Sequence, residues 1–182
     1  MPNNAKLIVR RLSGAVALLL WLSACSTTLP NQDPTGEIFP AVSGETLAGE
    51  PVALPDDLKG DFAILLIGYK QDAQFDIDRW ILGLLQAEVT TRLLEVPTIP
   101  GAVASVASEF IDNGMRSGIP QEDWRLVVTL YGGAAKPVAR FTGNQNGNNA
   151  RVVVLDPDGR VAWFSDNGYS ASKVLQVAGL LK

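Results

Sequence analysis

The hydrophobic pattern alternates between strand-like and helix-like stretches over most of the chain. Residues 62–68 form a continuous apolar run, which is typical of a central strand covered on both faces. Residues 73–88 carry apolar side chains three and four positions apart, which predicts an amphipathic helix. Further strands are expected at 92–96 and 125–131, with a helix at 102–113 between them. Two prolines are expected to end the first of these strands, and a glycine is expected to stop that helix.

The last third of the chain predicts a hairpin followed by a helix. Residues 151–155 and 160–164 flank Asp156-Pro-Asp-Gly, a type I turn sequence with proline at its second position. Ser170 is placed to N-cap a final apolar-faced helix. Two short extended pieces are expected within 39–54, and after them the order is β–α–β–α–β–β–β–α, which defines an α/β sheet protein.

The first 24 residues have the parts of an export signal. Residues 1–11 are cationic, and residues 12–22 are apolar but too short to span a bilayer, which takes roughly 20 residues. The following Leu-Ser-Ala-Cys25 resembles the bacterial lipobox, whose cysteine thiol accepts diacylglycerol. We expect 1–24 to be a removed lipoprotein signal peptide and Cys25, the only cysteine, to become the acylated N-terminus, with palmitate among its acyl groups. The alternatives are an ordinary secretory signal with a chance cysteine, or a twin-arginine signal at Arg10-Arg11.

The residues after Cys25 predict location and domain boundaries. By resemblance to Gram-negative lipoproteins, Ser26 in place of aspartate favours sorting to the outer membrane, facing the periplasm of the cell envelope. Residues 25–36 are polar and hold two prolines, so we expect a flexible tether. No second linker follows, which predicts one domain over 37–182.

Charge and composition exclude several kinds of chemistry. Three of the 15 Lys and Arg residues and none of the 19 Asp and Glu residues lie in the signal, so the remainder has a net charge of −7. No basic cluster follows residue 25, which argues against nucleic acid as a partner. The chain has no histidine, which excludes Ser-His-Asp and Cys-His nucleophiles and His-ligated metals. A single cysteine excludes an internal disulfide, and we expect no metal and no cofactor.

Three framework pieces carry a family resemblance over 38–182: Gly44-Glu-Thr-Leu-Ala-Gly-Glu-Pro-Val-Ala-Leu-Pro, Leu58-Lys-Gly-Asp, and Val152-Val-Val-Leu-Asp-Pro-Asp-Gly-Arg-Val. Their order resembles the redoxin branch of the thioredoxin-like fold, which implies a central mixed sheet with a C-terminal β-hairpin and helix. The resemblance also implies a reactive cysteine at the helix start after the first central strand, and a cis-proline before the hairpin. The first position reads Gly68-Tyr-Lys-Gln-Asp-Ala-Gln and the second is about Ala150, so both features are missing.

A fainter resemblance concerns the mitochondrial ATP synthase assembly factor family of the same fold. It rests on the spacing of Gln74, Asp78 and Trp80, and on Arg160-Val-Ala-Trp163 followed by Gly168 and Tyr169. It implies a non-redox role in assembling a membrane complex and transfers no catalytic residue.

The candidate binding residues lie at the corner between the apolar strand and the first helix. Binding sites in open α/β sheets favour this edge. The alternative is a solvated helix start with Asp72 as N-cap. Trp163 and Tyr169 are candidates to flank the same edge as a partner surface, although core packing is the alternative for Trp163. The corner residues are Tyr69, Lys70, Gln71, Asp72 and Gln74.

The leading hypothesis is therefore a membrane-anchored, non-catalytic thioredoxin-like lipoprotein. It would bind an envelope protein or assist its assembly, and it would not be an enzyme. The alternatives are a redox protein acting with a partner's thiol and a lipoprotein that binds a small ligand at the corner, where an apolar pocket would then be expected.

Overall fold

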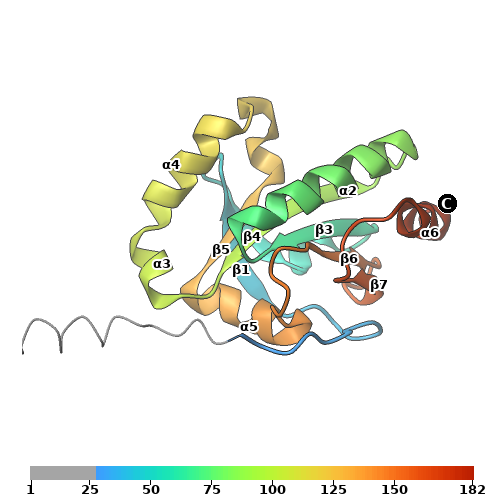
Figure 1. The fold of residues 1–182 in the computed structure, drawn as a ribbon, viewed down its shortest axis with the longest axis horizontal. Coiled ribbons are helices and arrows are strands. Elements are labelled where there is room, and N and C mark those ends of the chain that lie inside the picture. Colours follow the sequence, from blue (N-terminus) through green and yellow to red (C-terminus); the bar gives the residue numbers. More distant parts are fainter. Residues whose placement is uncertain (1–27) are drawn as a thin grey trace, which may run out of the picture.

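The computed structural model describes residues 28–182, apart from the side chains of Ala102 and Val103. The export signal and Cys25 lie outside the described residues. The described chain forms a seven-stranded mixed sheet in the order β2-β1-β5-β4-β3-β6-β7 (Figure 1). The strands are β1 (Val42–Thr46), β2 (Pro51–Leu54), β3 (Ala63–Gly68), β4 (Arg92–Ile99), β5 (Val128–Tyr131), β6 (Arg151–Leu155) and β7 (Val161–Ser165).

The helices lie in two layers around the sheet. The α-helices are α2 (Gln74–Gln86), α3 (Ala102–Val106), α4 (Ser108–Gly118), α5 (Gly132–Thr142) and α6 (Ala171–Leu180), and the 3-10 helices are η1 (Asp56–Leu58), η2 (Gln71–Ala73) and η3 (Gln121–Leu126). Figure 1 shows α2 above the sheet and α5 below it.

Strand β3 is the centre of the fold. It pairs in parallel with β4 and antiparallel with β6, and all six of its residues are buried. Leu65 and Ile67 pack into a core that includes α5, whereas Ile64 and Leu66 pack into a second core with α2 and α6. The apolar run is thus a strand covered on both faces, as expected.

Several expected elements differ in extent. Strand β4 continues through Pro97 to Ile99. Pro97 is the last residue of β4 that pairs with β3, and Thr98 and Ile99 pair only with β5. The expected helix over 102–113 is two helices, and α4 runs past Gly114 to Gly118. The strand expected at 125–131 begins only at Val128, because η3 occupies the residues before it.

Helix α5 was not expected from the sequence. It starts at Gly132, where φ is 51°, and contains Pro137, so its sequence reads like a loop. Ala135, Val138 and Ala139 are nonetheless buried at helical spacing. The final helix is confirmed: the Ser170 side chain accepts a hydrogen bond from the Lys173 backbone N–H.

The expected flexible tether is wrong for residues 29–36, which we call the strap. The backbone N–H of Gln32 donates to the carbonyl of Thr142 at 3.1 Å, and that of Gly36 donates to Val161 at 2.8 Å. Gly143, with φ of 68°, lies so close that an added Cβ would overlap the carbonyl of Pro30. The polar strap is ordered because the domain itself supplies its hydrogen-bond partners.

No helix within residues 28–182 has the length and apolar character needed to cross a bilayer.

Candidate functional site

The corner after β3 is anchored by Tyr69. Its hydroxyl lies 2.7 Å from the Thr142 hydroxyl, and the Arg151 guanidinium lies 5.3 Å from its ring centroid. Burial raises the pKa of Tyr69 to about 12, against opposing effects of Thr142 and Arg151. The phenol therefore stays protonated at neutral pH and contributes packing rather than a nucleophile.

Arg151 is fully buried at the start of β6. Its guanidinium donates to the carbonyls of Asn146 at 3.1 Å and Asn149 at 2.9 Å, and also to the carbonyl of Gln145. It further donates to the side-chain oxygen of Asn31 at 2.8 Å. Burial lowers the pKa of Arg151, and neighbouring Tyr69 and Asp166 oppose that shift. Arg151 thus joins the strap to the 143–149 loop beneath the corner, a role that sequence reasoning missed.

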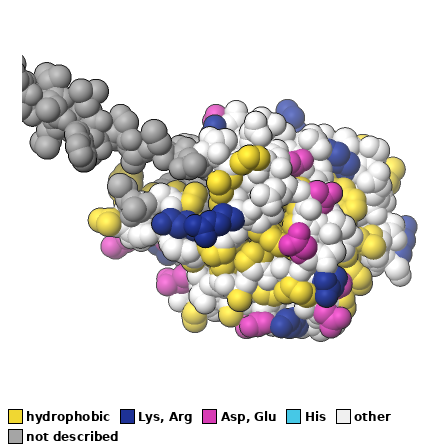
Figure 2. Space-filling model, turned by 90° about the horizontal axis from the view of Figure 1, so that it is seen from below, with side chains coloured by type: hydrophobic (Ala, Val, Ile, Leu, Met, Phe, Trp, Pro, Cys, Tyr) yellow, Lys and Arg dark blue, Asp and Glu magenta, His cyan; other side chains and the backbone are white. Residues whose placement is uncertain are grey.

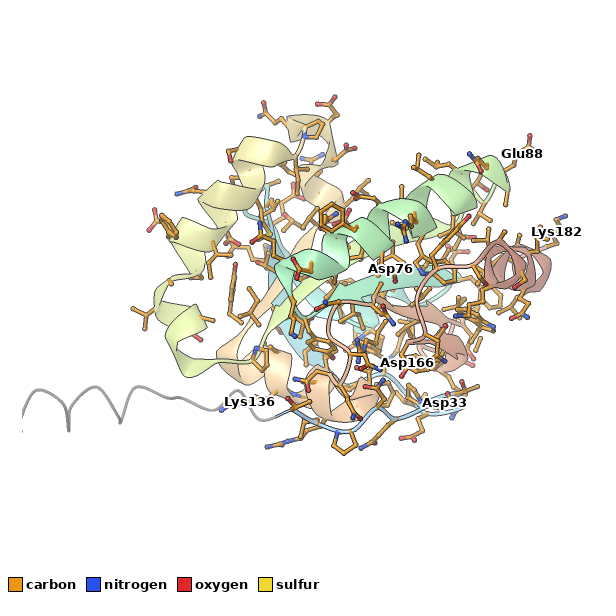
Figure 3. All side chains as sticks on the ribbon, in the orientation of Figure 1. Asp33, Asp76, Glu88, Lys136, Asp166 and Lys182 are labelled. Atoms are coloured by element: carbon orange, nitrogen blue, oxygen red, sulfur yellow. The ribbon has the colours of Figure 1, made fainter. Side chains whose placement is uncertain are left out.

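Asp76 binds backbone groups on the opposite side of the corner. It is only 8% exposed, and its two carboxylate oxygens accept from the backbone N–H groups of Ala150 at 2.9 Å and Tyr169 at 2.7 Å. Asp76 lies in the first turn of α2 and is labelled in Figure 3. Ala150 is the position where the family resemblance implies a cis-proline. A proline has no N–H, so the bond to Asp76 requires another residue there.

The remaining corner residues are mostly exposed. Gln71 and Asp72 lie in η2, whose N-cap is Lys70, and the N-cap of α2 is Ala73, so the alternative in which Asp72 is the N-cap is wrong. The Lys70 side chain lies over Gly147. Gln74 donates to Asp78 at 2.9 Å and to Glu95 at 3.4 Å, toward β4. Burial is the main cause that raises the pKa of Glu95 above its ordinary value.

Trp163 and Tyr169 do not join the corner in one surface. Their rings contact Trp80 edge-on, with centroids 6.0 Å and 5.9 Å away, in the core beneath α2 and α6. Tyr69 packs against the other core, on the α5 side of the sheet. The core-packing alternative therefore describes Trp163, and Tyr169 reaches the corner only through its backbone bond to Asp76.

The described residues contain no metal site, and the depression that the structure shows is not at the corner. Within 28–182, no group of three or more His, Cys, Asp and Glu could hold a metal ion. A shallow depression lies instead at the amino ends of β3 and β4, lined by residues that include Asp61, Phe62 and Arg92. On the face drawn in Figure 2, basic and acidic side chains are interspersed.

Comparisons with known proteins define the class by fold. No family model matches the chain, and no curated protein matches it. Three of the solved structures that are similar to this chain illustrate the class. The thioredoxin domain of a thiol-disulfide oxidoreductase from Bacteroides vulgatus is 16% identical, with 83% of this chain and 100% of that one covered and a TM-score of 0.56. The exposed lipoprotein thioredoxin of Streptococcus pneumoniae is 14% identical, with 78% and 100% covered and a TM-score of 0.56. BsSco, of a family of cytochrome c oxidase assembly proteins, is 11% identical, with 82% and 95% covered and a TM-score of 0.54.

The chain therefore has the thioredoxin-like fold, and the expected fold class is confirmed. At the corner where the resemblance implies a reactive cysteine, it has Tyr69, Lys70, Gln71 and Asp72, and the only cysteine of the chain is Cys25.

Proposed function

We propose that this protein is a membrane-anchored, non-catalytic thioredoxin-like lipoprotein of the cell envelope that binds another envelope protein or assists its assembly. The observation that carries the proposal is the bonding of Asp76 to Ala150 and Tyr169. These hydrogen bonds occupy the end of the sheet where the fold holds its thiol chemistry. The corner has become a fixed structural feature that can present a surface but offers no thiolate.

Two comparisons support this proposal. A similar structure is described as an exposed lipoprotein, and another belongs to a family of assembly proteins. The fold therefore occurs in both settings, although fold alone does not decide function. The small-ligand alternative is less favoured because the depression lies at the other end of β3.

The partner is expected to contact the exposed corner residues Lys70, Gln71 and Asp72. A photo-crosslinking amino acid at Gln71 should capture one discrete envelope protein in intact cells. The matched control is the same amino acid at Gln86, which is exposed at the other end of α2. Equal capture from both positions would contradict a binding surface at the corner.

The anchor is tested separately. Cys25→Ser should abolish labelling with a radioactive fatty acid and release the protein from membranes, since the acyl chains are what hold it. Retained labelling would show that Cys25 is not the lipid site.

The absence of catalysis has its own test. A chain that begins at Ser26 contains no thiol, so it should neither reduce insulin disulfides nor consume peroxide above background. An enzymatic rate in either assay would favour the redox alternative and require a chemistry without thiols.

A further inference from the structure

The strap begins close to the proposed lipid site. The backbone N–H of Leu29 donates to the side chain of Asn144 at 2.7 Å, and its carbonyl accepts from the N–H groups of Asn144 and Gln145 at 3.1 Å and 3.0 Å. At about 3.3–3.6 Å per residue, the four steps from Cys25 to Leu29 reach at most about 14 Å. That limit holds whatever path the intervening residues take.

This reach is short compared with the domain. A domain of this length has a radius of gyration of about 15 Å, and hence a radius near 19 Å if it is roughly spherical. An anchor of about 14 Å therefore keeps Leu29 on the half of the domain that faces the bilayer. The opposite end of the molecule is held away from the lipid.

The surface around this attachment point carries exposed cations on α5, and Asp33 is an exposed acidic residue of the strap. Residues 124–155 contain no Asp or Glu, although the mature chain is strongly acidic. Lys136 and Arg140 lie one turn apart on α5, both are exposed, and neither makes a salt bridge within the described residues. Lys70 adds a third exposed cation beside the 143–149 loop.

Figure 3 shows Lys136 beside the point where the described chain begins, whereas Asp33 and Asp166 lie further along the same side. Lys and Arg side chains close to an anionic membrane are attracted to its surface. Three such cations are a modest but directional contribution.

We infer that the strap and the exposed cations of α5 orient the domain, with α5 and the 143–149 loop against the anionic headgroups of the membrane that carries its own lipid. The inference rests on the proposed lipid anchor at Cys25. Arg151 is the residue that makes the orientation rigid, because it binds both the strap and the loop. The corner at Lys70 then lies at the bilayer surface, so the partner is engaged next to the membrane.

Energy transfer from a single dye to a lipid acceptor tests the orientation. The acylated sulfur of Cys25 is a thioether, so an introduced cysteine is the only free thiol. Gly133→Cys places the dye on α5, where an added Cβ meets open space, and Gln86→Cys places it at the far end of α2. In vesicles of phosphatidylethanolamine and phosphatidylglycerol, transfer should be higher from position 133 than from position 86. Equal transfer from protein that floats with the vesicles would overturn the orientation alone.

Flotation and mass spectrometry of the acyl chains keep the two proposals distinguishable. Protein that carries no lipid and does not float would refute the anchor, and the orientation with it.

Further variants separate the effect of the strap from the effect of the cations on α5. Insertion of fifteen Gly and Ser residues between Thr27 and Thr28 should remove the difference in energy transfer between positions 133 and 86 in neutral phosphatidylcholine vesicles. The reason is that the longer connection lets the domain rotate freely. In the anionic vesicles the inserted chain should keep part of the difference. The added changes Lys136→Glu and Arg140→Glu should remove it, whereas Arg79→Glu, an exposed control on α2, should not. Equal effects of the two sets would overturn the role of the α5 surface.

Discussion

Removal of the Asp76 carboxylate is the most informative single change to the corner. Asp76→Ala leaves two backbone N–H groups without their acceptor. A hydrogen bond to a charged group contributes about 1.5–3 kcal/mol. The N–H of fully buried Ala150 loses this contribution in full, whereas the N–H of half-buried Tyr169 can regain part of the contribution by bonding to water. We therefore expect a loss of about 2–4 kcal/mol in the free energy of unfolding.

Urea unfolding followed by tryptophan fluorescence measures this loss, because buried Trp80 lies in the core beside Tyr169. For a domain of this size the melting temperature should fall by about 5–15 °C. Asp78→Ala is the matched control: it removes a carboxylate from an exposed position on the same helix, and its effect should stay within about 0.5 kcal/mol. Equal destabilisation by the two changes would refute the structural role of Asp76.

A second change tests the specific bond. Ala150→Pro removes the N–H that Asp76 accepts, so it should be less destabilising in the Asp76→Ala background than in the native chain. A coupling of about 1 kcal/mol or more is expected for groups in direct contact. Additive effects would mean that the bond between Asp76 and Ala150 contributes nothing specific.

Three further predictions concern the core, the strap and Tyr69. Leu65→Asp should abolish cooperative unfolding because it places a charge in a fully buried strand, whereas Leu82→Asp, at an exposed position, should not. Gly143→Ala should detach the strap and expose 28–36 to proteolysis, whereas Gly36→Ala, which has a similar positive φ but open space, should leave it protected. Tyr69 has a pKa of about 12, above its ordinary value of 10.0, so its contribution to stability is complete below pH 10 and is lost as the pH rises through 12. Ultraviolet titration of the native chain and of Tyr69→Phe checks this, because the substitution should remove an absorbance step near pH 12. Removal of a step near pH 10 instead would contradict the prediction.

The sequence predicted the framework where periodicity was strong. The run at β3, the spacing in α2, the turn before β7 and the cap at Ser170 all depend on local patterns that the structure retains. Helix α5 was missed because two glycines and a proline hid the helical spacing of three small buried residues. The strap was missed because its composition says nothing about partners elsewhere in the chain.

The alternation of side chains along a strand could not predict whether Trp163 shares a surface with Tyr69. Along β7, Val161 and Trp163 should share a face of the sheet. A register irregularity opposite Val154 and Leu155 inserts Ala162 as an extra residue, so Val161 packs in one core and Trp163 in the other. A bulge of this kind has no reliable sequence signal, and it separates Trp163 from Tyr69. Arg151 and Asp76 were equally hidden, because Arg151 binds the side chain of Asn31 and Asp76 binds the backbone N–H of Ala150, and both partners are far away in the sequence.

Under the proposed export, the positions of the strap's partners would set an order of events. Leu29 binds Asn144, 115 positions later in the chain, and Gly36 binds Val161. In a chain that crosses a membrane with its amino end first, these partners arrive only after most of the domain has been delivered. The strap must remain open throughout that interval, because its hydrogen-bond acceptors and donors do not yet exist on the same side. Enzymes that act on Cys25 during that interval would meet an unfolded peptide, before the strap is attached to the domain.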